Sequence, residues 1–185
     1  MGIRKSNGTI IPLASGTTLS VSTNRFGNTF FSATIGFGAN GTGFISENQF
    51  FINPSALSPN VTFPVPRNGT ITAVSAFFSY SGPSNENNPI PFDLTVTVHA
   101  QIFAAPPGTD TFQALPETLV TFDTGITRDT PVETTMHGII KDLSIPIIEE
   151  TRLLTVFFAT STSTNPLGRL DTEIIGFGSA GINIV

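Results

Sequence analysis

The residues that could do chemistry are few and lie far apart in this sequence of 185 residues. There is no Cys, which excludes disulfides, thiolate metal sites and cysteine nucleophiles. The two histidines, His99 and His137, have no second ligand at the close spacing that a metal site uses. Ser179 lies in a glycine-flanked stretch but not at the spacing of a Gly-x-Ser-x-Gly elbow. We therefore expect ordinary surface or turn histidines and neither metal nor cofactor.

Carboxylates are the remaining candidates, because a pair of them can hydrolyse glycosides. Those available are Asp93, Asp123, Asp129, Asp142, Glu149 and Glu150. Glu149 and Glu150 would point to opposite faces of an extended strand, so we interpret them as solvated rim charge. Sugar sites also use Trp and Tyr platforms, and this chain has no Trp and one Tyr. The sequence therefore predicts a protein that is not an enzyme.

Charge is sparse, which bears on the partners of the protein. Charged residues make up 11% of the chain, against about 25% in ordinary soluble domains, and the net charge is -5. A nucleic-acid binder needs a basic surface, so this balance argues against one. The glycines and hydroxyls break every apolar run before the roughly 18–20 residues of a membrane-spanning helix. A chain that hides surface against its own copies needs fewer charges, and self-assembly is our first hypothesis.

Short runs of Val, Ile, Phe and Thr, separated by turn residues about every ten positions, predict an all-β fold. The class we expect is an antiparallel β-sandwich or barrel. The predicted strands are Thr18–Thr23, Thr29–Gly38, Gly43–Ile52, Val61–Val65, Thr70–Tyr80, Phe92–Phe103, Thr118–Phe122, Leu143–Ile147, Thr151–Thr160 and Thr172–Ile184.

The pattern within strands predicts which faces are covered. Phe92–Phe103 alternates apolar and polar residues, so one of its faces meets water. Ile71–Tyr80 and Leu153–Ala159 are apolar or small at both parities, so both faces should be covered. In a sandwich one cover is the opposite sheet, and without helices we expect the other to be a neighbouring subunit. Ile35–Gly38 recurs as Ile175–Gly178, and we hypothesise that these two Gly-Phe-Gly segments pair.

Several segments, taken in order, resemble the C-terminal domain of the BclB-type exosporium glycoproteins of spore-forming bacteria. The resemblance runs from about Ile11 to Ile184. The segments that carry it are Ile11–Gly16, Ile35–Gly38, Phe63–Ser79, Leu94–Phe103, Leu143–Ile147, Glu150–Thr160 and Gly178–Ile182.

This resemblance implies a jelly roll of the tumour-necrosis-factor or C1q type, which usually trimerises, and a structural role on the spore surface. It also implies synthesis in the mother-cell cytoplasm without a signal peptide. Family members carry a collagen-like stalk, whereas no Gly-x-y run is present here. We therefore expect an N-terminal arm, residues 1–15, followed by a jelly-roll domain, residues 16–185. The arm, through Ile3, Ile10 and Ile11, would connect subunits by adding a strand to a neighbour.

The function predicted from these observations is that of a self-assembling spore-surface protein, in the exosporium layer or an appendage. Its partner is itself, most simply as a homotrimer or a fibre, with other spore-surface proteins as further candidates. The expected interface residues are Phe37, Phe77, Phe78, Phe157, Phe158 and Phe177. One alternative is an adhesive head that recognises sugar or a receptor through loops 81–91 and 105–111. A further alternative is a viral capsid or fibre protein.

Overall fold

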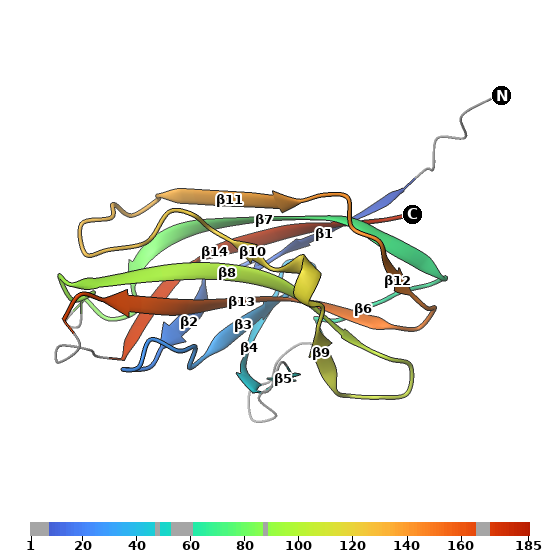
Figure 1. The fold of residues 1–185 in the computed structure, drawn as a ribbon, viewed down its shortest axis with the longest axis horizontal. Coiled ribbons are helices and arrows are strands. Elements are labelled where there is room, and N and C mark those ends of the chain that lie inside the picture. Colours follow the sequence, from blue (N-terminus) through green and yellow to red (C-terminus); the bar gives the residue numbers. More distant parts are fainter. Residues whose placement is uncertain (1–7, 47–48, 53–60, 87–88, 166–170) are drawn as a thin grey trace.

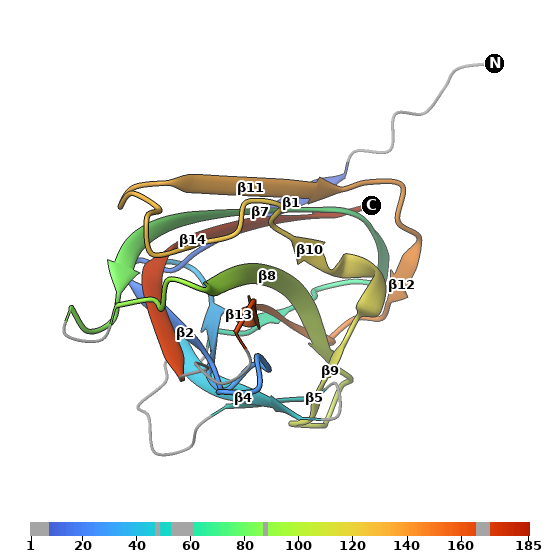
Figure 2. The ribbon, with the colours of Figure 1, turned by 60° about the vertical axis from the view of Figure 1, so that its left-hand side comes forward.

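Two antiparallel sheets face each other in the computed structural model, which describes residues 8–46, 49–52, 61–86, 89–165 and 171–185 (Figures 1 and 2). Sheet A contains β1 (Thr9–Ala14), β2 (Leu19–Thr23), β7 (Gly69–Pro83), β11 (Thr135–Ile140), β12 (Ile145–Ile147) and β14 (Thr172–Ile184). Sheet B contains β3 (Ser32–Ile35), β4 (Asn40–Ser46), β5 (Gln49–Ile52), β6 (Phe63–Pro64), β8 (Leu94–Ala105), β9 (Phe112–Ala114), β10 (Val120–Thr121) and β13 (Arg152–Ser163). The helical structure in the described residues is a single 3₁₀ turn, Pro116–Thr118.

The strand order is that of a jelly roll. β7 pairs with β14 in sheet A, while the strands nested between them, β8 and β13, pair in sheet B. β1 then pairs with β14, so the first and last strands lie side by side. The outer pair and the inner pair thus lie in different sheets, as happens when a long antiparallel pair of strands folds over to form a jelly roll. This order confirms the all-β jelly roll expected from the sequence.

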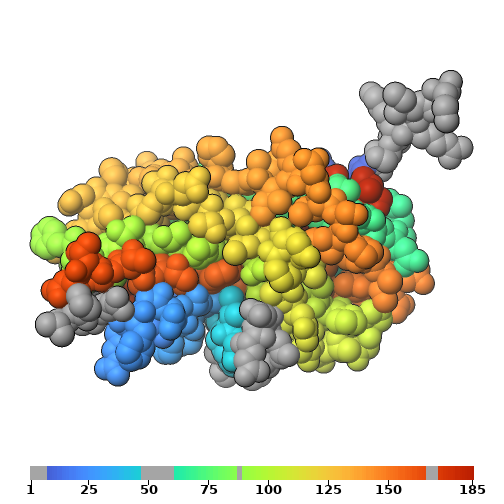
Figure 3. Space-filling view, in the orientation of Figure 1, coloured from blue at the N-terminus to red at the C-terminus, as the bar shows by residue number. Residues whose placement is uncertain are grey.

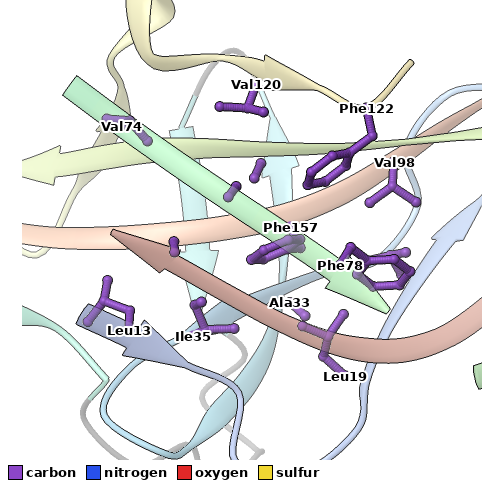
Figure 4. Close-up of a cluster of buried hydrophobic side chains, with 14 of the residues drawn as sticks. Leu13, Leu19, Ala33, Ile35, Val74, Phe78, Val98, Val120, Phe122 and Phe157 are labelled. Atoms are coloured by element: carbon purple, nitrogen blue, oxygen red, sulfur yellow. The ribbon is translucent and has the colours of Figure 1, made fainter. Parts of the chain in front are cut away.

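The core between the sheets forms because alternate residues of the long strands point inward. Phe157 of β13 lies 6.1 Å from the ring of Phe78 and 6.4 Å from that of Phe122, measured between centroids. Figure 4 shows these rings among aliphatic side chains such as Val98 and Leu19. Full burial of a Phe side chain is worth about 1.5–3 kcal/mol, so this aromatic cluster is a main stabilising element of the sandwich.

A second, smaller core lies on the other side of β13. From β13 the pairing runs through β3, β4, β5 and β9 back to β8, and β8 pairs directly with β13. Sheet B therefore curls into a ring. Inside it, Leu154 and Val156 of β13 pack with Phe103 and Phe112. The chain itself thus covers the second face of this part of β13, and the expectation of a neighbouring subunit there is wrong.

β1 is the main departure from the predicted domain division. All six of its residues pair with Ser179–Ile184 of the same chain, and Ile11 and Leu13 are buried in the core. The stretch Thr9–Ala14 is thus a strand of the jelly roll rather than a connecting arm. Its alternation of buried and exposed residues spans only six residues and includes Pro12, and a proline in so short a run argues against a strand when the sequence alone is considered.

The other predicted strands recur with shifted limits. Gly43–Ile52, expected as one strand, forms parts of the two paired strands β4 and β5, and Thr118–Phe122 shortens because the 3₁₀ turn occupies its start. β9 and β11 were not expected. β11 lies at the edge of sheet A, and Figure 3 shows the segment around it, yellow to orange, along the upper edge of the molecule.

The two Gly-Phe-Gly segments do not pair with each other. The end of β1 and the residue that follows it lie against both segments instead: Ala14 N–H donates to the Gly36 carbonyl (2.7 Å) and Ser15 N–H to the Gly178 carbonyl (2.9 Å). A Cβ atom at Gly178 would lie 2.7 Å from the Leu19 side chain, so this glycine permits close packing in the core. Among the described residues, no helix is long and apolar enough to cross a membrane.

Candidate functional site

The outer face of sheet A carries exposed apolar side chains on four of its strands. Along β1, β7, β11 and β14, one parity is buried in the core and the other points outward. The outward side chains include Ile10, Phe77, Ile139 and Phe177, which are between 39% and 70% exposed. These four strands are neighbours in the sheet, so the exposed apolar groups form one surface.

The strand register arranges this surface in rows across the sheet. One row places His137, Phe77, Ser179 and Ala14 opposite one another on successive strands. The next row places Ile139, Ser75, Gly181 and Pro12 in the same way. In the second row, the small residues Ser75 of β7 and Gly181 of β14 lie at the centre and the bulky Ile139 lies at the β11 edge. In the first row, Phe77 of β7 stands beside the small Ser179 of β14.

This arrangement leaves a shallow hollow of about 680 Å³ over the centre of the sheet. Its floor contains Ser75, Ser179 and Gly181, and Ile10 and Ile139 line its sides. None of its lining residues is Asp, Glu, Lys or Arg; they are Ile10, Pro12, Leu13, Ala14, Ser75, Ala76, Phe77, His137, Gly138, Ile139, Ser179, Ala180 and Gly181. We define this set, together with Phe177, as the sheet A face. It offers an uncharged, largely apolar surface with a trough between two raised borders.

Three of the predicted interface residues are exposed. Phe77 and Phe177 lie on the sheet A face, 39% and 47% exposed. Phe37 follows β3 and is 64% exposed, with its ring 6.1 Å from that of Phe63. Ile139 is a further exposed apolar residue that the sequence analysis did not predict. In β11, Met136 and Gly138 are more buried than the residues beside them, and this alternation places Ile139 on the outward side.

Two of the predicted interface residues, Phe78 and Phe157, are fully buried in the core of the subunit. They point inward at the parity opposite to Phe77 and Phe158, so they cannot reach a neighbouring subunit, and the expectation is wrong for both. Phe158 is half-buried on the outside of sheet B, where it stacks on His99 with 5.0 Å between ring centroids.

The residues assigned to an N-terminal arm have separate positions. Ile3 lies outside the described residues. Ile11 is 4% exposed and belongs to the core, which excludes it from a connector between subunits. Ile10, at 70% exposure, points to the opposite side of β1 and contributes to the sheet A face.

His99 ties three strands of sheet B together. Its Nδ1 lies 3.0 Å from the Thr121 hydroxyl of β10, and its Nε2 lies 2.9 Å from the Thr160 hydroxyl of β13. Burial lowers the pKa of His99 below its usual value, because desolvation disfavours the charged ring. With a threonine at each nitrogen and an aromatic ring on one face, this histidine has a structural role.

Asp93, Asp142 and Glu150, three of the carboxylates that could have formed a glycosidase pair, lie in different connections of the fold. Asp93, just before β8, accepts a hydrogen bond of 2.8 Å from the Ser163 hydroxyl. Asp142 and Glu150 sit at left-handed backbone positions, with φ of 60° and 65°, in the turns on either side of β12. Within the described ranges, no three His, Cys, Asp or Glu side chains come together as a metal site.

The two loops assigned to the adhesive alternative lie at opposite ends of the molecule. They are joined by β8, whose 12 residues span roughly 36 Å at about 3.3 Å per step. Figure 1 shows the β7–β8 connection at one end and the β8–β9 connection at the other. Loops 81–91 and 105–111 therefore cannot form one site within a subunit.

The fold and its strand order define a jelly-roll protein. No family model matches the sequence. The chain is 29% identical over 181 residues, 94% of its length, to Collagen-like protein 1 of Acanthamoeba polyphaga mimivirus, and it spans about 19% of the length of that relative. Similar solved structures include Eiger TNF from S. frugiperda, with a TM-score of 0.34, 8% identity and coverage of 91% of this chain and 93% of that one. The structure of the infectious bursal disease virus Gx strain has a TM-score of 0.31 and 10% identity, and the match covers all of this chain and 44% of the viral chain.

Proposed function

We propose that this chain is a structural, non-enzymatic jelly-roll subunit of the bacterial spore surface that assembles with copies of itself, as a homotrimer, through the sheet A face. The observation that carries the proposal is an uncharged apolar surface spread over four neighbouring strands. Such a surface on a soluble chain favours association, because contiguous apolar patches left in water are costly.

The shape of the sheet A face suits a second copy. The raised borders at Ile10 and Ile139 are bulky, whereas Ser75 and Gly181 leave the trough open between them. A border of one subunit placed in the trough of another would bury both without leaving a charged group unpaired. In a closed trimer, each subunit would place its border in the trough of one neighbour and receive the border of the other neighbour in its own trough, which is a head-to-tail contact that closes into a ring.

The gain from this contact is comparable to the cost of association. Ile10, Phe77 and Ile139 are 70%, 39% and 56% exposed. Covering these exposed fractions is worth roughly 2.5–5 kcal/mol per subunit, from about 1.5–3 kcal/mol per fully buried side chain. Two subunits together gain roughly 5–10 kcal/mol, against a cost of about 4–15 kcal/mol for lost motion. The remaining residues of the face therefore decide how stable the assembly is.

The trimeric state and the spore-surface location have separate support. The relative named as a collagen-like protein supports an association with collagen-like chains. A collagen triple helix joins three chains, so a domain carried on one is held beside two further copies. The location is supported by the resemblance of the ordered segments between Ile11 and Ile184 to exosporium proteins.

A matched pair of isoleucines tests the assembly. Ile139, on the sheet A face, is 56% exposed, and Ile148, between β12 and β13, is 57% exposed. We expect sedimentation velocity and light scattering to show a trimer for the parent protein and for Ile148→Lys. Ile139→Lys should shift the protein to monomers, because it buries an unpaired charge in every contact.

Two results would contradict the proposed assembly. A parent protein that stays monomeric at high concentration would contradict the assembly, and equal effects of Ile139→Lys and Ile148→Lys would contradict the role of the sheet A face.

Immunogold labelling of intact spores tests the location, since a spore-surface protein is labelled without permeabilisation. Labelling that appears only in sectioned spore interiors would contradict that part of the proposal.

A further inference from the structure

A bulge in the connection between β2 and β3 presents two phenylalanines on the same side. Phe30 N–H donates to the Ser22 carbonyl (2.8 Å), and Ser22 N–H donates to the Phe31 carbonyl (3.0 Å). The Ser22 hydroxyl accepts a further hydrogen bond from Phe31 N–H (3.0 Å). Two residues thus stand opposite one, which is the definition of a β-bulge. Bulges redirect side chains, and here the two ring centroids lie only 4.4 Å apart.

These rings are held in an exposed position although both are apolar. Phe30 is 51% exposed and Phe31 is 47% exposed, while Ser22, which fixes their backbone, is buried. In a regular strand, consecutive side chains point to opposite faces, so one of the two would be free to enter the core. The bulge instead keeps both rings at the surface, side by side.

The ring pair borders a hollow of about 260 Å³ that has polar groups on its other sides. Besides the two phenylalanines, its lining residues are Ser22, Ser84, Asn85, Asp171, Thr172 and Glu173. The lining residues come from β2, from the β2–β3, β7–β8 and β13–β14 connections and from the start of β14, at the end of the molecule opposite to the chain termini (Figure 1).

The two carboxylates of the hollow are oriented by hydrogen bonds. The Glu173 carboxylate accepts from the Ser84 hydroxyl (2.7 Å) and from the Ser20 hydroxyl. Asp171 Oδ1 accepts from the backbone N–H of Arg25 (2.7 Å). Both side chains therefore have preferred positions before any ligand arrives, and their lone pairs allow each carboxylate to accept further hydrogen bonds.

We propose that this hollow binds an uncharged saccharide ring. The C–H face of a sugar packs on an aromatic ring, and its hydroxyls donate to carboxylates and exchange hydrogen bonds with Ser and Asn side chains. The hollow supplies both kinds of surface on adjacent sides. Because Phe has no polar tip, recognition of hydroxyls falls to Asp171 and Glu173. The same two carboxylates disfavour uronic and sialic acids, which carry a charge of like sign.

The residues that define the sheet A face include no carboxylate and none of the residues that line the saccharide hollow, so the saccharide site is independent of the proposed assembly. A largely apolar hollow without Asp, Glu, Lys or Arg suits another protein surface, whereas paired rings beside oriented carboxylates suit a polyhydroxylated ligand. A subunit that does not assemble can still bind sugar, and an assembly without sugar binding remains intact.

Saturation-transfer NMR on the full chain tests the site, with D-glucose, D-galactose, D-mannose and N-acetyl-D-glucosamine as uncharged probes and D-glucuronic acid as the charged one. We expect contact with at least one uncharged probe and weaker contact with the acid. The double variant Phe30→Ala/Phe31→Ala should weaken binding by about tenfold or more. The control is Phe26→Ala, because Phe26 is 64% exposed in the same connection but does not line the hollow.

Carboxylate variants separate a sugar site from a cation site. Asp171→Asn/Glu173→Gln should weaken the uncharged probes while circular dichroism stays unchanged. Calorimetry with calcium chloride should show no binding that this variant removes. Absence of contact with all four uncharged probes would overturn the proposal. So would binding that survives the double phenylalanine variant, tighter binding of the acid, or calcium binding that depends on the carboxylates and not on the rings.

Discussion

Leu153 and Leu154 are consecutive residues of β13 that face two different cores. Both are fully buried; Leu153 belongs to the core between the sheets and Leu154 to the core inside the sheet B ring. We predict that Leu154→Ala destabilises the fold as much as Leu153→Ala. Loss of three buried carbons at about 0.8 kcal/mol each gives roughly 2.4 kcal/mol. The cavity left behind brings the total to about 2–5 kcal/mol for either variant.

The assay is urea unfolding of parent and variants at low and high protein concentration. Because β3, β4, β5 and β9 belong to the same chain, the loss at Leu154 should not depend on protein concentration. A loss below about 1 kcal/mol would refute the second core, since a fully buried Leu→Ala change costs more than that. A loss that disappears on dilution would show that a neighbouring subunit, and not this chain, covers Leu154.

Three further predictions concern single residues, His99, Tyr80 and Gly176. Burial lowers the pKa of His99 below 6.5, so the unfolded chain takes up its proton first and stability should fall as the pH drops through 6.5, by at most about 1.4 kcal/mol per pH unit. Thermal melts of His99→Gln should lose this decline and those of His137→Gln should keep it; the reverse would contradict the assignment. Burial raises the pKa of Tyr80 above 10.0, so stability is full below that pH and falls above it. Tyrosinate absorbance of this one tyrosine should rise only with unfolding, and a normal titration of the intact fold would count against its burial. Gly176→Ala should cost about 1–3 kcal/mol, because its Cβ would overlap the Ser79 carbonyl and the Phe78 ring. A Cβ at Gly181 would meet the flexible Ser75 hydroxyl at 3.0 Å and the Ile10 side chain at an ordinary contact distance, so Gly181→Ala should cost less; equal urea midpoints would refute this account.

Much of the fold could be predicted from local patterns. The alternation in Phe92–Phe103 correctly placed alternate residues of β8 from Leu94 to Ile102 in the core, and the turn residues separated most strands. It was wrong for Phe92, which is 77% exposed, and for Gln101, which is buried although its parity was expected to meet water. The two apolar parities of β13 correctly indicated two covered faces. Their pattern could not tell which segment provides the second cover, because burial against a distant part of the chain and burial against a second subunit select the same residue types.

The candidate sites were harder to predict because they depend on register and on local irregularity. The sheet A face needs β1 and β11, two short edge strands that were not recognised, and only pairing brings Ile10 and Ile139 to the same surface. The saccharide hollow depends on a bulge that turns Phe30 and Phe31 to the same side. A regular strand would separate the two rings, so their adjacency in sequence carried no signal.

The pairing of β1 with β14 gives the molecule a polarity. Thr9 lies opposite Ile184, so both ends of the described chain leave from one pole (Figures 1 and 2). The connections that line the hollow beside Phe30 and Phe31 occupy the other pole. Any tether fused to either terminus would therefore hold the subunit by its base and point the same tip outward. Labels or surface anchors attached at the N-terminus and at the C-terminus should present the protein in the same orientation.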